Sequence, residues 1–135
     1  MIVLNEICEK CNDICNNIHF QRNFKNWTSD NNGIDNFIRD TQLLAHNNVS
    51  KVLEWIPYDR FCNIEYIAKG GFGKVYKANW IDGPIEKWDN KNQNWKRFGS
   101  RVVALKSLNN SQNVTLEFIN EVKINLFMKL KYEIY

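Results

Sequence analysis

The pattern of apolar and polar positions changes near Pro57, from helical spacing before it to strand-like alternation after it. Between residues 30 and 46 the apolar side chains recur every three or four positions, which predicts a short amphipathic helix. Asp30 or Asn31 is available as its amino-terminal cap. Pro57 disfavours the helical conformation at Ile56, so we place a domain boundary there. The expected inner face of the helix contains Ile34, Phe37, Ile38, Thr41, Leu44 and Ala45.

Three strands and a second helix are predicted after this boundary. Residues 61–67 alternate, residues 72–80 are rich in aromatic and β-branched side chains, and the glycines between them predict a hairpin turn. Residues 101–108 form the third strand, and the apolar residues of 114–130 predict a helix that packs on the sheet. The polar stretch 81–100, which begins with an Asp-Gly-Pro turn, is expected to be a long loop.

Composition limits the class of protein. A chain of 135 residues with 44% hydrophobic and 13% aromatic residues can fold one modest domain, or a small lobe with a flanking segment. Its 18 basic side chains are scattered among 15 acidic ones, so we expect no nucleic-acid partner. No apolar run is long enough for a membrane span, and no secretory signal begins the chain. We therefore expect no membrane association and a cytoplasmic location, with the nucleus as the alternative.

A glycine-rich string lies between the first two predicted strands and reads Ile67-Ala-Lys-Gly-Gly-Phe-Gly-Lys-Val-Tyr-Lys-Ala78. Gly70 and Gly73 would let backbone N–H groups approach the phosphate oxygens of a nucleotide. Phe72 would shield these phosphates from solvent, and Val75 would cover the purine. Taken alone, the string fits a tight hairpin turn equally well.

The third predicted strand carries Val103-Ala-Leu-Lys106, and its lysine would reach the α- and β-phosphates. A lysine side chain needs a carboxylate to hold it in place for this role. Glu121, near the middle of the predicted final helix, is the preferred partner. Glu117, one helical turn earlier, is the alternative.

In this order, the glycine-rich loop, the V-A-L-K strand and the helix with a central Glu resemble the opening signature of the protein kinase superfamily. The resemblance covers residues 64–130 and implies an α+β amino-terminal lobe of three antiparallel strands and one helix. It implies that Ala104 lines the adenine pocket, and Ala68 stands where the family has its first glycine. The implied cofactor is ATP, with Mg²⁺ in a complete relative, and the implied reaction is phosphorylation of protein Ser or Thr.

Three shorter strings narrow the resemblance to fungal tyrosine-kinase-like kinases that are specific for Ser and Thr. They are F-x-N-W-T-S from Phe24, W-I-P-Y-D from Trp55 and W-x-D-G-P from Trp80. The family's H-R-D and D-F-G motifs, which supply the catalytic base and a Mg²⁺ ligand, do not occur. We therefore expect the 135-residue chain to be catalytically inactive by itself. It would be either the product of a truncated gene model or a degenerate copy of a kinase domain.

The expected organisation is a helical, cysteine-bearing extension at residues 1–57, followed by a partial kinase domain at residues 58–135. The nucleotide is the expected ligand. The alternative function is that of a pseudokinase-like module without catalysis, which binds other proteins through the exposed helix and the edge of the sheet.

Cys8, Cys11, Cys15 and His19 offer four ligands in a short span, which is the number that tetrahedral zinc requires. The spacing differs from the paired C-x2-C units of common zinc modules. Cys11, Cys15 and His19 follow one another at intervals of four, so they could equally line one face of a helix. Two alternatives to a metal site stay open: reduced cysteines in a remnant of a longer zinc module, and incidental spacing. Cys62 is expected to be a small buried hydrophobic residue.

Overall fold

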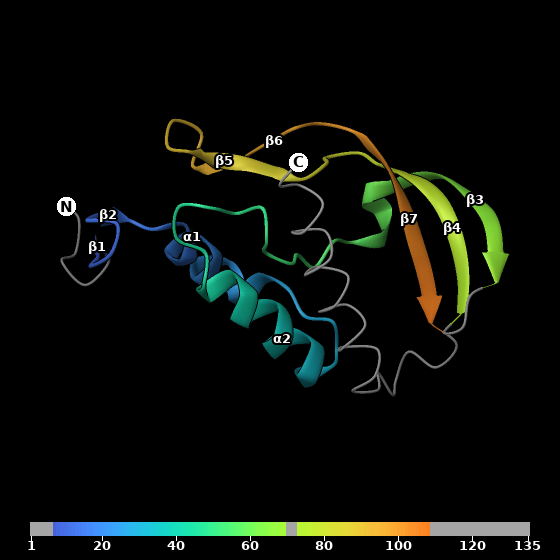
Figure 1. Cartoon of the computed structure of the whole chain (residues 1–135), viewed down its shortest axis with the longest axis horizontal. Coiled ribbons are helices and arrows are strands. Elements are labelled where there is room, and N and C mark those ends of the chain that lie inside the picture. Colours follow the sequence, from blue (N-terminus) through green and yellow to red (C-terminus); the bar gives the residue numbers. More distant parts are fainter. Residues whose placement is uncertain (1–6, 70–72, 109–135) are drawn as a thin grey trace, which may run out of the picture. The chain divides into compact units, whose positions relative to one another are not determined.

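The computed structural model describes residues 7–69 and 73–108, which form two compact units (Figure 1). Within these ranges, unit 1 comprises residues 7–62 and 79–102, and unit 2 comprises residues 63–69, 73–78 and 103–108. The segment 79–102 therefore groups with the amino-terminal extension, although it lies between two strands of unit 2 in the sequence. The structure is a mixed α+β arrangement of short helices and antiparallel strands.

Unit 1 begins with a small antiparallel hairpin of β1 (Ile7–Cys8) and β2 (Asp13–Ile14). Helix α1 (Asn16–Asn23) follows directly and continues into a short 3-10 turn, η2 (Phe24–Asn26). The apolar pattern does not predict α1, because its buried side chains are only His19 and Phe20, two consecutive residues. Two adjacent positions cannot produce the spacing that identifies an amphipathic helix.

Helix α2 (Asn32–Leu43) confirms the helix predicted between residues 30 and 46. Asn31 caps it, because its side-chain oxygen accepts hydrogen bonds from the backbone N–H groups of Gly33 and Ile34. Ile38 is buried as expected, but the assignment of Leu44 to the inner face is wrong. Leu44 is the C-cap residue that follows the last position of α2, and it is 78% exposed.

The prediction of a long loop at residues 81–100 is also wrong. This segment contains an antiparallel hairpin of β5 (Ile85–Asp89) and β6 (Asn94–Arg97), in which Trp88 pairs with Trp95. The turn is stabilised by the Asp89 carboxylate, which accepts a hydrogen bond of 2.9 Å from the backbone N–H of Lys91. The residues around the two tryptophans are mostly polar, so the sequence shows no clear alternation of apolar and polar positions there. The cross-strand pair of Trp88 and Trp95 stabilises the pairing of the two strands.

The core of unit 1 combines three segments that are far apart in the sequence. Phe20 comes from α1, Ala45 from the segment after α2, and Ile85 from β5. Their packing shows that the extension and the β5–β6 hairpin fold together. Partly buried side chains that pack against this core are Phe24, Val49, Val52 and Trp95.

Unit 2 is centred on a three-stranded sheet in the order β3-β4-β7 (Figure 1). Its strands β3 (Phe61–Lys69), β4 (Gly73–Trp80) and β7 (Arg101–Leu108) confirm the three predicted strands, and a 3-10 turn, η3 (Tyr58–Arg60), leads into the first. Cys62 is exposed on β3, so the prediction that it is buried is wrong. The helix predicted at 114–130 lies outside the described residues. Among the described helices, none has the length and apolar character needed to cross a membrane.

Candidate metal centre and nucleotide-binding strands

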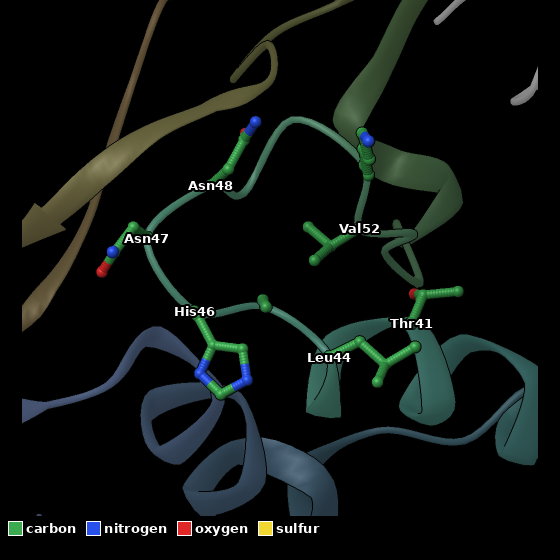
Figure 2. Close-up of a pocket in the computed structure, with 8 residues that line it drawn as sticks. Thr41, Leu44, His46, Asn47, Asn48 and Val52 are labelled. Carbon is green, nitrogen blue, oxygen red and sulfur yellow. The ribbon is translucent and has the colours of Figure 1, made fainter. Parts of the chain in front are cut away.

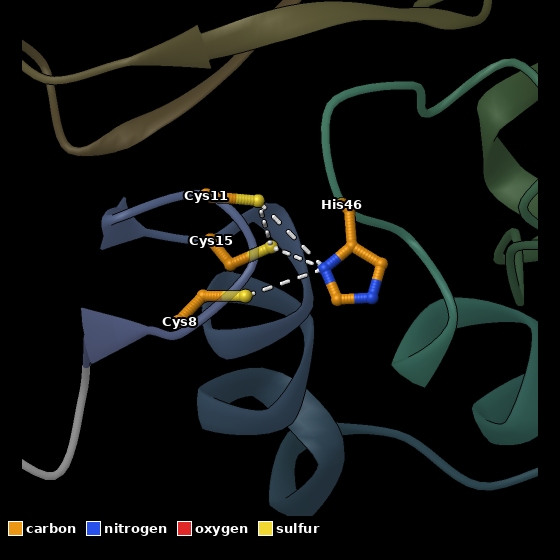
Figure 3. Close-up of side chains that lie close together, drawn as sticks. All are labelled: Cys8, Cys11, Cys15 and His46. Atoms are coloured by element: carbon orange, nitrogen blue, oxygen red, sulfur yellow. Dashed lines mark hydrogen bonds between the residues drawn. The ribbon is translucent and has the colours of Figure 1, made fainter.

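Four side chains with soft or borderline ligand atoms converge in unit 1 (Figure 3). The sulfur atoms of Cys8, Cys11 and Cys15 and a ring nitrogen of His46 all lie within 4.8 Å of one another. The structure thus brings together the three cysteines of the predicted metal site. Its fourth member is His46, which sequence analysis did not select, and not His19.

The distances within this cluster centre on one atom, Nδ1 of His46. This nitrogen lies 3.4 Å from Cys8 Sγ, 3.7 Å from Cys11 Sγ and 3.2 Å from Cys15 Sγ. A ring nitrogen carries either one N–H or one lone pair, so it can form only one good hydrogen bond in its plane. Three sulfur atoms around one nitrogen are therefore poorly explained by hydrogen bonds alone.

The β1–β2 hairpin positions the first two cysteines. Its turn is closed by the backbone N–H of Asn12, which donates a 2.7 Å hydrogen bond to the carbonyl oxygen of Cys8. The backbone N–H groups of Cys11 and Lys10 stabilise the thiolate of Cys8 and lower its pKa to about 6. Such backbone donors are the groups that support a metal-bound sulfur.

The thiol of Cys11 behaves in the opposite way. Desolvation, together with hydrogen bonds to Cys15 and Cys8 and repulsion from them, raises its pKa to about 12. Two neighbouring thiolates repel each other when no cation lies between them. The cluster therefore favours full ionisation of its three sulfur atoms only when it holds a positive ion.

Three consecutive residues at the start of α1 bind the segment that carries His46. Cys15 Sγ donates to the carbonyl oxygen of Ala45 at 3.5 Å, and Asn16 Nδ2 donates to that of His46 at 2.5 Å. Asn17 Nδ2 donates to the carbonyl oxygen of Leu43 at 3.3 Å, which satisfies one of the terminal acceptors of α2. These contacts fix the backbone of His46 next to the three cysteines.

His19 has a packing role in this structure. Its ring is buried and stacks on Trp88, with the ring centroids 3.7 Å apart and the planes 9° from parallel. The spacing of Cys11, Cys15 and His19 suggested His19 because it is local, whereas His46 is separated from Cys15 by 31 positions. The sequence contains no signal of that contact beyond a histidine at the end of the predicted helix.

In unit 2, the sheet carries the described members of the predicted nucleotide site. Ala104 and Lys106 are both exposed on β7, and as alternate residues of a strand they lie on the same face. Val75 lies on the neighbouring strand β4, where it is partly buried. The remaining described members are Ala68, next to last on β3, and Gly73, the first residue of β4.

Gly70, Phe72 and Glu121, which were also predicted for this site, lie outside the described residues. Three residues join β3 to the adjacent β4, so the glycine-rich string spans the connection of a hairpin. This confirms the two predicted strands on either side of the string, whereas the predicted turn lies outside the described residues. The pairing of β4 with β7 brings the strand of Lys106 next to β4. No protein-family model, curated protein or solved structure matches this chain.

Proposed function

We propose that the chain is the ATP-binding amino-terminal lobe of a protein kinase. The observation that supports this most directly is the strand order β3-β4-β7. In that order, the hairpin that carries the glycine-rich string lies beside the strand that carries Ala104 and Lys106. These two sequence features are separated by the β5–β6 insertion, so their place on one sheet is not a consequence of sequence proximity.

Each described residue has a distinct role in this proposal. Val75 and Ala104, on adjacent strands of one sheet, would offer small apolar surfaces to a purine. Lys106 lies two residues beyond Ala104, about 7 Å further along the same face of the strand. It would meet the phosphates of a nucleotide whose base packs on Ala104, and its ammonium group would neutralise their charge.

The reaction class is transfer of the ATP γ-phosphoryl group to Ser or Thr hydroxyls in proteins. Such catalysis depends on positioning and charge neutralisation, and it requires a Mg²⁺-binding Asp and a catalytic base in addition to this lobe. The chain itself would bind and orient the nucleotide. The alternative function is that of a module that binds other proteins but no nucleotide, and a nucleotide-binding experiment distinguishes the two functions.

Calorimetric titration of the chain with Mg-ATP tests the proposal. We expect measurable binding that is lost in Lys106→Met, while Lys74→Met on the adjacent strand keeps it. Lys74 is a matched control because it is also an exposed lysine of the same sheet. No heat of binding at millimolar ATP would reject nucleotide binding and leave the protein-binding alternative.

We also propose that Cys8, Cys11, Cys15 and His46 hold a zinc ion. Tetrahedral zinc with Zn–S and Zn–N bonds of about 2.3 and 2.0 Å separates two sulfurs by about 3.8 Å and a sulfur from a nitrogen by about 3.5 Å. The corresponding distances here are 3.5 Å between Cys11 and Cys15, and 3.2 to 3.7 Å from the sulfurs to His46. These distances are close to those of a shared zinc ion, and every other pair of ligand atoms lies within 4.8 Å.

Three thiolates and one imidazole complete a tetrahedron, which is typical of a structural site and leaves no coordination position for a substrate. When bound, zinc would supply folding free energy and keep the thiols ionised. Metal analysis of the purified chain should find one equivalent of zinc, and Cys15→Ser should lose it. The exposed Cys62 provides the control, because Cys62→Ser should retain the metal.

A further inference from the structure

The β5–β6 hairpin is attached to the rest of unit 1 through its two tryptophans, through Ile85 and through the ion pair of Arg97 with Glu54. Trp88 stacks on His19, and Trp95 packs on Phe20 with ring centroids 4.5 Å apart. Trp88 and Trp95 also meet edge to face, with centroids 4.9 Å apart. Both partners of these tryptophans lie on α1, within five residues of Cys15, the residue that precedes the helix.

The same hairpin also contacts the segment that follows α2. Ile85 of β5 belongs to the same core cluster as Ala45, the residue next to His46. The surface that receives the hairpin therefore has two parts. One part is α1, which begins after Cys15, and the other is the segment that carries His46.

The second part is a loop with an open face. A pocket of about 500 Å³ lies between the end of α2 and the loop after it (Figure 2). Val49 and Val52 of this loop pack against the core of unit 1, and hydrogen bonds from residues 15–17 hold its beginning. The residues that line the pocket are Thr41, Leu44, Ala45, His46, Asn47, Asn48, Lys51 and Val52.

We propose that the metal ion at the Cys8–Cys11–Cys15–His46 centre is a clamp on which folding of the β5–β6 hairpin depends. The ion joins Cys15 to His46, and so it fixes α1 against the loop after α2. Only this arrangement creates the combined surface for Ile85, Trp88 and Trp95. This inference rests on the proposed zinc site.

An isolated two-stranded hairpin is marginally stable in water, so β5 and β6 need that surface to persist. The core they join is small: it consists of Phe20, Ala45 and Ile85 with their partly buried neighbours. Small cores commonly require a metal or another cross-link for stability. Loss of the ion should therefore release a hairpin that begins 77 residues after the first ligand, Cys8, but shares a core with Ala45, the neighbour of His46.

Fluorine NMR of the full chain labelled with 5-fluorotryptophan tests the clamp. The Trp88→Phe and Trp95→Phe variants assign the two hairpin resonances. Removal of zinc with a chelator should move both resonances toward the position of solvent-exposed fluorotryptophan, and addition of one equivalent of zinc should restore them.

Two variants of His46 test its role as a metal ligand. His46→Ala should keep the metal-free spectrum in the presence of zinc, whereas His46→Cys, which replaces one ligand by another, should recover the zinc-bound spectrum.

His19→Ala should still bind one equivalent of zinc but shift the Trp88 resonance. If one equivalent of zinc binds and the Trp88 and Trp95 resonances do not change, the clamp is rejected and the metal site stands. If less than about a tenth of an equivalent binds to the wild-type chain, both the site and the clamp are rejected.

Discussion

The sulfur of Cys15 lies 3.2 Å from Nδ1 of His46, although 31 positions separate the two residues. Cys15 is only 2% exposed, and its thiol also contacts the carbonyl oxygen of Ala45. The contact therefore lies between the start of α1 and the segment after α2, and it is partly buried. A metal ion bound there would connect two segments that are far apart in the sequence.

Removal of a group that supports this contact should weaken metal binding without removing a ligand. Asn16→Ala deletes the 2.5 Å hydrogen bond to the carbonyl oxygen of His46. We expect the zinc affinity to fall by about tenfold, as is usual for groups that orient a ligand. Competition with a chromophoric chelator measures this change. Asn26→Ala, which removes an exposed hydrogen bond to Asn23, should leave the affinity unchanged, and an equal loss in both variants would contradict the supporting role of Asn16.

Two arginine–carboxylate pairs of unit 1 should differ in their contribution to stability. Arg97 binds Glu54 with both terminal nitrogens, and the two side chains are 25% and 16% exposed. Arg97→Met leaves a mostly buried carboxylate without its partner, so we expect a loss of about 2 kcal/mol in the free energy of unfolding. Urea unfolding in zinc-containing buffer measures it.

Arg60→Met is the matched comparison. Arg60 also binds a carboxylate with two nitrogens, that of Asp82, but these side chains are 41% and 32% exposed. Solvent screens such a pair, and we expect a loss below about 1 kcal/mol. A larger loss for Arg60→Met than for Arg97→Met would show that burial does not govern these pairs.

The sequence predicted elements whose signals are local. Helix α2 and the strands β3, β4 and β7 follow from the periodicity of their own residues, and the position of the glycine-rich string at a hairpin connection follows from its neighbours. The β5–β6 hairpin was missed because its alternation consists of few apolar residues within a polar stretch. Its stability comes from Phe20 and His19, which lie some 65 to 75 residues earlier in the chain.

The same distinction applies to the metal centre. Cys8, Cys11 and Cys15 were recognised because they are close in sequence and share one chemistry. His46 was not recognised, because the contact that selects it depends on where α2 ends and how the next residues return to α1. No spacing rule describes such a contact, whereas the competing His19 satisfied a simple helical interval and is instead a packing residue.

Asp35 should make the stability of unit 1 dependent on pH. Burial raises its pKa, but hydrogen bonds from Ser29 and Thr28 to the carboxylate outweigh that effect, and the pKa is lowered below its usual range. A carboxyl group with a lowered pKa stabilises the fold above its unfolded pKa of about 3.9, and this stabilisation is lost as the pH falls through the folded value.

The Asp35→Asn variant isolates that contribution. At pH 7 we expect it to be less stable than the wild type by about 1 to 3 kcal/mol, because the amide cannot accept all three hydrogen bonds from residues 28 and 29. The difference should decrease as the pH falls below 4. Urea unfolding of both proteins at each pH gives it, and the pH dependence of the metal site cancels because both proteins contain that site. A difference that is constant from pH 7 to pH 3 would contradict the assignment.

Gly83 and Gly99 provide a final test, at the two ends of the β5–β6 insertion. Both residues have positive φ, 68° and 92°, in the region that side chains rarely adopt. A Cβ at Gly83 would overlap the backbone carbonyl of Gly99, whereas a Cβ at Gly99 would meet nothing within 4 Å. Gly99→Ala should therefore cost only the conformational term, about 1 kcal/mol. Gly83→Ala must also displace the backbone of Gly99, because the new Cβ would overlap it. We therefore expect this variant to lose at least about 2 kcal/mol in the free energy of unfolding. Thermal unfolding of the two zinc-bound variants compares these costs directly. If both variants lose the same stability, the backbones at the base of the hairpin are not in the close contact on which the larger cost depends.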